Sequence, residues 1–192
     1  MKVPYKKLSL PVSAPAVALF AVLAFSLLTG TGSLTSTEAF LIGLVFHAGF
    51  SSVPAMIDIR RGKFPDFEFP ERRKRRKYYF FAALGDGIGL LAYYWSGAPA
   101  LSALALTYVL SASLVGLINE KWKISAHAAG LTGPLVLALA LFGLNASPLL
   151  VLVPLTFWLR IKTGAHNFLQ LAGGGLLAAG CALASLAALR LL

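Results

Sequence analysis

Long apolar runs separated by short polar links are the dominant pattern of this chain. Most of the runs approach or reach the roughly 17 to 25 residues that a helix needs to cross a bilayer. The sixth run is the shortest, so it either crosses or is only partly inserted. The pattern predicts an all-α transmembrane helix bundle with six to seven spans, over residues 13–28, 38–57, 78–95, 100–118, 127–144, 149–159 and 166–189.

Composition places the chain among integral membrane proteins. Of its 192 residues, 58% are hydrophobic and only 12% are charged. A soluble domain of this size cannot bury that much apolar surface. The basic start and the first apolar run would suit a secretory signal peptide, but no clear small-residue cleavage site follows. We therefore interpret the first run as a transmembrane helix and expect one integral-membrane domain over residues 1–192.

The positive charge falls on one side of the predicted bundle. With seven spans, the N-terminus, the basic loop 58–77 and the later polar links share one face. Of the 17 lysines and arginines, only Arg190 falls on the other face. The positive-inside rule then puts the N-terminus and the links in the cytoplasm. Because topology accounts for the net charge of +10, we do not expect nucleic-acid binding. Most of the run 72–77 is expected to fix topology or to contact anionic lipids.

Two polar links, 119–127 and 160–170, carry side chains that suit phosphoryl transfer. A neutral imidazole can attack phosphorus, and a second imidazole can protonate the leaving oxygen. Arginine holds phosphate oxygens in a fork, and serine donates one further hydrogen bond. The side chains concerned are Lys123, Ser125, His127, Arg160 and His166.

The last helix is expected to begin at His166, where its positive dipole end would favour phosphate. Gln170 lies four residues later, so on one helical face its amide would hold the imidazole.

These residues give the chain a resemblance to the type 2 phosphatidic acid phosphatase (PAP2) superfamily of membrane lipid phosphatases. Ile124-Ser125-Ala126-His127 keeps the serine and the histidine of the family's Pro-Ser-Gly-His motif. Arg160, His166 and Gln170 keep the arginine, the histidine and the spacing of the Ser-Arg-x5-His-x3-Asp motif. The resemblance covers roughly residues 58–175.

The resemblance implies a PAP2-like core and a role for each matching residue. His166 would be the phosphohistidine nucleophile, and His127 would be the acid for the departing alcohol. Ser125 and Arg160 would be phosphate ligands. The family's first motif, Lys-x6-Arg-Pro, is absent, and its expected counterpart is the segment 66–76. There, Arg72 and Arg75 stand one helical turn apart and are the expected phosphate clamp.

Two departures from the family pattern stand out. Gln170 replaces the acid that normally steadies the nucleophile, although a divergent branch of the superfamily with glutamine there also looks similar. Two predicted spans separate the basic loop from Ser125, whereas better-known members keep those motifs on one loop. An altered membrane arrangement with a cytoplasmic pocket follows.

Simpler interpretations compete at several positions. Either motif histidine alone would often be an interfacial anchor, and Lys123 is more often a snorkelling side chain than a phosphate ligand. Within the spans, Asp86 is expected to bond a neighbouring helix or to support the pocket from behind, and His47 is expected to be structural. A metal site is disfavoured, because the chain has three histidines and one cysteine without carboxylates at ligand spacing. We expect no cofactor.

Two functions from different classes fit these observations. The first is a metal-independent phosphatase that acts on a lipid or isoprenoid phosphate or diphosphate. The second is a non-catalytic binder or transporter of lipid phosphates or polyprenyl phosphates, and Gln170 is its best support. A lipid-phosphate transferase is a weaker third possibility. The sequence leaves the substrate and the oligomeric state open.

Overall fold

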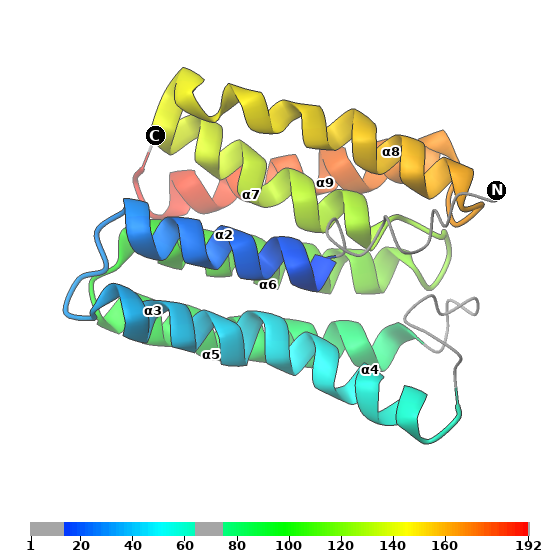
Figure 1. The fold of residues 1–192 in the computed structure, drawn as a ribbon, viewed down its shortest axis with the longest axis horizontal. Helices are drawn as coiled ribbons and strands as arrows, with labels where there is room; N and C mark the ends of the chain where they lie inside the picture. The colour runs from blue at the N-terminus through cyan, green and yellow to red at the C-terminus, as the bar shows by residue number, and fades with distance from the viewer. Residues whose placement is uncertain (1–13, 64–74, 192) are drawn as a thin grey trace, which may run out of the picture.

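The computed structural model describes residues 14–63 and 75–191, and regular structure within those ranges is entirely helical. The helices lie side by side along the long axis of the molecule, and successive helical passes run in opposite directions, with residues 36–60 making one pass (Figure 1). The prediction of an all-α bundle is therefore confirmed for the described residues. The elements are α2 (Ala14–Leu28), α3 (Ser36–Gly43), η1 (Leu44–Gly49), α4 (Phe50–Arg60), α5 (Arg76–Trp95), α6 (Pro99–Ile118), α7 (Ala126–Phe142), η3 (Gly143–Val151), α8 (Leu152–Lys162) and α9 (Phe168–Ala188).

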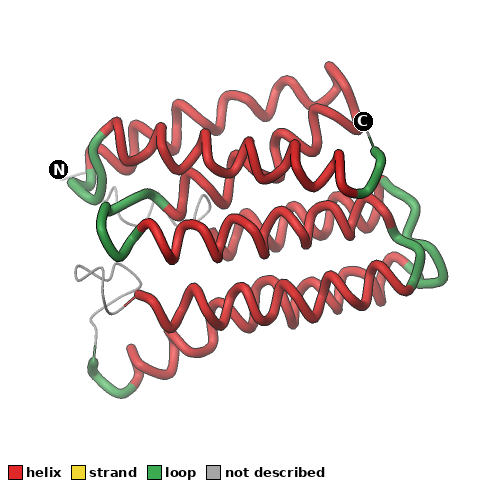
Figure 2. Tube along the Cα trace, turned by 180° about the vertical axis from the view of Figure 1, so that it is seen from behind, coloured by secondary structure: helices red, strands yellow, loops and turns green. Residues whose placement is uncertain are grey.

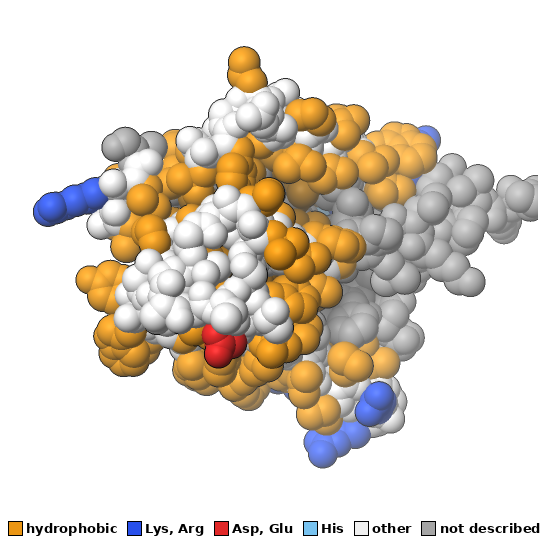
Figure 3. All heavy atoms as spheres, turned by 60° about the vertical axis from the view of Figure 1, so that its left-hand side comes forward, with side chains coloured by type: hydrophobic (Ala, Val, Ile, Leu, Met, Phe, Trp, Pro, Cys, Tyr) orange, Lys and Arg blue, Asp and Glu red, His pale blue; other side chains and the backbone are white. Residues whose placement is uncertain are grey.

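Length and apolar composition mark this chain as a membrane protein. Three helical stretches of the described residues are long and apolar enough to cross a bilayer: Pro99–Ile118, Ala126–Lys162 and Phe168–Ala188. A fourth is added if the bent pair Ser36–Gly49 and Ser52–Arg60 counts as one span. Apolar side chains cover much of the described surface in Figure 3, as lipid contact requires. The expected total of six to seven spans stays a prediction.

The stretch 126–162 folds back on itself rather than running straight. Gly143 follows α7 with a φ of +60°, a conformation that residues with a Cβ rarely adopt. The chain then turns through the 3₁₀ segment η3 and returns as α8, which packs against α7 (Figure 1). Because of this reversal, the C-terminal end of α8 lies beside the N-terminal end of α7.

Helix α6 is the centre of the bundle. It packs most extensively against α5 and also contacts α7 and α9. Its buried positions are mostly small or aliphatic, which lets neighbouring backbones approach closely where no hydrophobic effect drives helices together. Leu101 and Leu104 are fully buried there, and the Tyr93 hydroxyl of α5 donates to the Ala39 carbonyl at 2.7 Å.

Local sequence signals explain where four of the described helices begin. Thr35 and Glu38 form a capping box at the start of α3, and Pro99 occupies the first turn of α6. Ser125 caps α7, and Asn167 caps α9. Figure 2 shows the connecting loops gathered at the two ends of the bundle. The two links that carry the sequence motifs lie at the same end, as expected from the alternation of helices.

The helical run 36–60 is broken near its middle. Its segment Leu44–Gly49 is π-helical, Pro54 interrupts the hydrogen-bond ladder of α4, and the two halves meet at a bend of 47°. Helix α5 lies against this break, and Gly85 permits the approach. A Cβ on Gly85 would stand 2.5 Å from the Phe46 carbonyl oxygen and would also strike the Phe50 side chain.

Replacing Gly85 by alanine tests this close packing. We expect Gly85→Ala to lower stability by about 1 to 3 kcal/mol, because the added methyl meets a backbone oxygen that has no room to yield. Gly87→Ala on the same helix is the matched control, since a Cβ there meets nothing within 4 Å. Thermal unfolding in detergent measures both variants. Equal effects of the two substitutions would contradict the packing described.

Candidate functional site

A backbone contact joins the two motif-bearing links. The Ser125 amide donates to the Gln170 carbonyl at 3.0 Å, so the end of the first link is tied to the first turn of α9. Helices α7 and α9 pack along their lengths and begin at the same end of the bundle. Their positive dipole ends therefore point to one place.

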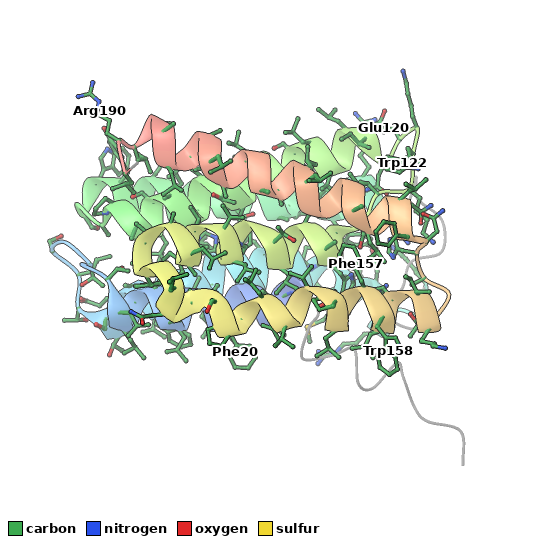
Figure 4. The ribbon with its side chains drawn as sticks, turned by 90° about the horizontal axis from the view of Figure 1, so that it is seen from above. Phe20, Glu120, Trp122, Phe157, Trp158 and Arg190 are labelled. Carbon is green, nitrogen blue, oxygen red and sulfur yellow. The ribbon has the colours of Figure 1, made fainter. Side chains whose placement is uncertain are left out.

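Two glycines of α9 allow the first link to lie directly on that helix. A Cβ on Gly174 would strike the Ser125 carbonyl oxygen, and one on Gly173 would meet the Trp122 ring at 2.7 Å. Figure 4 shows Trp122 at the same end of the molecule as Phe157 and Trp158, opposite Arg190. Any larger side chain at either glycine would push the link, and Ser125 with it, away from α9.

The second link is folded so that Arg160 and His166 are adjacent. The Arg160 carbonyl accepts from the Ala165 amide at 3.1 Å and from the His166 amide at 3.3 Å. Gly164 makes this turn possible with a φ of +67°. Arg160 lies in the last turn of α8 and is only 3% exposed. A short loop thus places a buried guanidinium beside a buried imidazole.

Four predicted site residues lie within electrostatic range of His166, namely Arg75, Lys123, His127 and Arg160. The ring is 8% exposed. Burial, and then the charges of Arg160, Lys123 and Arg75, lower its pKa to about 3. His127 lies in the first turn of α7, within electrostatic range of Arg160, His166 and Arg75. The structure therefore brings together residues from α7, α8, both links and the start of α5.

The imidazole of His166 is buried without a geometrically sound hydrogen bond. Neither ring nitrogen forms a hydrogen bond of good geometry with a described residue. The Ile124 backbone lies nearby and slightly favours the protonated form of the ring. Buried polar groups in folded proteins are nearly always paired, so an unpaired one calls for an explanation. The two ring nitrogens are therefore placed where a ligand atom would complete their hydrogen bonding.

Ser125 has a structural task as well as its predicted one. Its hydroxyl accepts from the Ala128 amide at 3.3 Å and so caps α7, and the residue is fully buried. The hydroxyl hydrogen is not used by this bond and can still be donated to a ligand.

The structure gives Gln170 a role other than the expected one. Helix α9 begins at Phe168, so His166 precedes the cap residue Asn167 and does not share a helical face with Gln170. The Gln170 side-chain oxygen instead accepts from the Asn167 amide at 3.2 Å, which completes a capping box. The position of His166 comes from the Arg160 carbonyl, and the expectation that Gln170 orients the ring is wrong.

The structure describes only one of the two arginines of the expected phosphate clamp. Arg72 lies outside the described residues. Arg75, just before α5, hydrogen-bonds the Tyr79 hydroxyl, which also accepts from the Asn119 amide group at 3.3 Å. Asn119 is buried at the start of the first link and donates to the Val115 carbonyl too. Sequence reasoning missed Tyr79 and Asn119 as supports, although an asparagine that ends an apolar helix was a usable signal.

No family model matches this chain, and neither the curated proteins nor the solved structures contain a match to it. Among residues 14–63 and 75–191, no three histidine, cysteine or acidic side chains gather in a way that could hold a metal ion. The site is therefore characterised by its own geometry: two histidines, three cations and two helix N-termini.

The lowered pKa of His166 predicts acid sensitivity. In the unfolded chain the ring regains an ordinary pKa of about 6.5. Between pH 6.5 and the folded value of about 3, the unfolded state binds a proton that the folded state does not. Stability therefore falls as the pH is lowered through this range, by at most about 1.4 kcal/mol per pH unit from this group.

Thermal unfolding midpoints between neutral and acid pH, for the parent protein and for His166→Gln, measure this contribution. We expect a shallower loss of stability in the variant. An identical pH dependence in both proteins would contradict the burial of His166 among cations.

Proposed function

We propose that this protein is a membrane lipid phosphatase of the PAP2 type, which works without a metal through a phosphohistidine on His166. The observation that carries the proposal is the His166 ring: buried, neutral and without a sound hydrogen bond, with Arg160, Lys123 and Arg75 acting on it. A neutral imidazole keeps the lone pair that a nucleophile needs. The surrounding cations suit the charge that develops on a transferring phosphoryl group.

The proposed reaction has two steps. The bound phosphate first brings a proton to His127, because its negative charge offsets the cations beside that ring. A ring nitrogen of His166 then attacks phosphorus, and the bond from phosphorus to the lipid oxygen breaks while protonated His127 gives that oxygen its proton. Water then attacks the phosphohistidine, His127 takes a proton from the water, and the phosphorus–nitrogen bond breaks to release phosphate. Arg160, together with Arg75 and Lys123, supports the negative charge in both steps.

The substrate is a phosphate or diphosphate on an apolar tail. The tail stays among lipids while the headgroup reaches the end of the bundle, where Trp122 and Trp158 are partly exposed as in an interfacial aromatic belt. In this proposal the helical passes make six to seven spans. The N-terminus and the site face the cytoplasm, and anionic lipids gather at the basic loop 58–77.

The second candidate is a binder or transporter of lipid phosphates that has no turnover. It is favoured by the capping role of Gln170, because no carboxylate acts on His166 within the described part of the chain. The acidic side chain of the first link, Glu120, pairs with Arg76 at 3.4 Å instead. An imidazolium formed at His166 would then lack a stabilising negative charge.

Phosphate release separates the two candidates. Purified protein in detergent with EDTA is given a panel of lipid monophosphates and diphosphates. We expect release by the parent protein, and a loss of at least about a hundredfold in His166→Ala and His127→Ala. Arg160→Gln should lower the rate of phosphate release roughly a hundredfold to a thousandfold. The variant lacks the buried positive charge that stabilises the transferred phosphoryl group.

Lys162→Gln is the matched control for Arg160→Gln. Lys162 is an exposed cation in the same last turn of α8, so its loss should leave phosphate release nearly unchanged. Absence of release from every lipid, with binding retained and weakened by Arg160→Gln alone, would reject the phosphatase and support the binder.

A further inference from the structure

A second buried ionisable cluster lies within the bundle, away from the links that carry the phosphate site. His47 and Asp86 are joined by a contact of 2.7 Å between Nδ1 and Oδ1. Their side chains are 0% and 7% exposed. His47 stands near the middle of the helical run 36–60, and Asp86 stands near the middle of α5. Ionisable side chains inside a membrane domain are costly, and they commonly mark functional sites.

His47 belongs to the break in the run 36–60. It lies within the π-helix Leu44–Gly49, just before the 47° bend and Pro54. A π-helical turn holds one residue more than an α-helical turn, so its conversion to α-helix would rotate the half that follows. Broken membrane helices with a polar residue at the break are also the form that ion-binding sites take in membrane transporters.

Two tyrosine rings pack beside His47. The ring lies 5.8 Å from the Tyr93 ring and 5.7 Å from the Tyr108 ring, measured between centroids. Gly89, one turn after Asp86, makes room for the imidazole, because a Cβ there would stand 3.0 Å from Cε1 and from Nε2. Two tyrosine faces and a carboxylate are suitable neighbours for an imidazolium.

Hydroxyl groups without partners continue this polar region along α6. The Tyr108 hydroxyl is buried close enough to Asp86 to feel its charge. Neither that hydroxyl nor the Ser111 hydroxyl, one turn further on, has a hydrogen-bond partner among the described residues. Unpaired buried hydroxyls are positions where water or a mobile proton can bind.

We propose that His47 and Asp86 form a proton-binding site, and that gain and loss of this proton sets the bend of the helical run 36–60. With the proton bound, both ring nitrogens carry hydrogen and the imidazolium–carboxylate pair has no net charge. When the proton leaves to water, neutral His47 faces an uncompensated Asp86 carboxylate. That charge is tolerated only if the bend changes and admits water.

The described elements around this pair carry their other ionisable groups mainly near the helix ends. Helix α2, which packs against η1, has no ionisable side chain. The ionisable groups on the other elements are of two kinds. Phenols lie beside His47, and the charged groups are paired or lie near the helix ends. Beside His47 these groups are Tyr93 on α5 and Tyr108 on α6, and near the helix ends they are Glu38 on α3, Asp58 and Arg60 on α4, and Arg76, Lys77, Tyr78, Tyr79 and Tyr94 on α5.

Spin-label distances across the break test the proposal. Leu41 and Ile57 lie on either side of the π-helix and are 48% and 43% exposed. Both are changed to cysteine in full-length Cys181→Ala protein, which removes the native cysteine, and the labelled protein is placed in lipid nanodiscs. We expect the mean distance between the labels to shift between about pH 5 and about pH 9.

His47→Gln/Asp86→Asn removes both charges together, so it leaves no unpaired buried ion and should fold. We expect its label distance to be independent of pH. Labels at Leu169 and Leu176, which are exposed on α9, are the control and should not move in either background. A parent distance that ignores pH, or an equal shift in the double variant, would overturn the proposal and leave the pair a structural contact.

Discussion

The candidate site depends on one close contact, that of the 122–125 link with the N-terminal half of α9. Gly173 and Gly174 admit the Trp122 ring and the Ser125 backbone, and the Ser125 amide then binds the Gln170 carbonyl. This contact holds the N-terminal ends of α7 and α9 side by side. Consequently the first turn of α7 brings His127 toward the turn that holds His166.

That arrangement creates a concentration of positive charge which needs an anion. Three cations and two helix N-termini surround two histidines, and among residues 14–63 and 75–191 no acidic side chain is one of the groups that act on His166. The like charges of such a cluster repel one another. In the proposed function, a bound phosphate would remove that repulsion and give the buried His166 nitrogens a partner. Binding and catalysis would therefore use the same electrostatic feature in the proposed function, and only chemistry at His166 would separate a phosphatase from a binder.

The sequence predicted the helices and the convergence of the links well, because alternating apolar runs determine which loops share an end. It did not predict roles that depend on local geometry. Gln170 could not be assigned from spacing, because a shift of two residues in the start of α9 decides whether it faces His166 or caps the helix. His47 and Asp86 were expected to be structural separately, since 39 residues separate them and only tertiary packing makes them a pair.

The most direct test of the account is detection of the covalent intermediate. Purified protein turning over a lipid phosphate is quenched in alkali, which preserves phosphohistidine, and its peptides are mapped by mass spectrometry. The account predicts phosphate on His166, and no other modified histidine. Binding of the lipid phosphate without any modified histidine would contradict a phosphohistidine mechanism and leave the pocket a binding site.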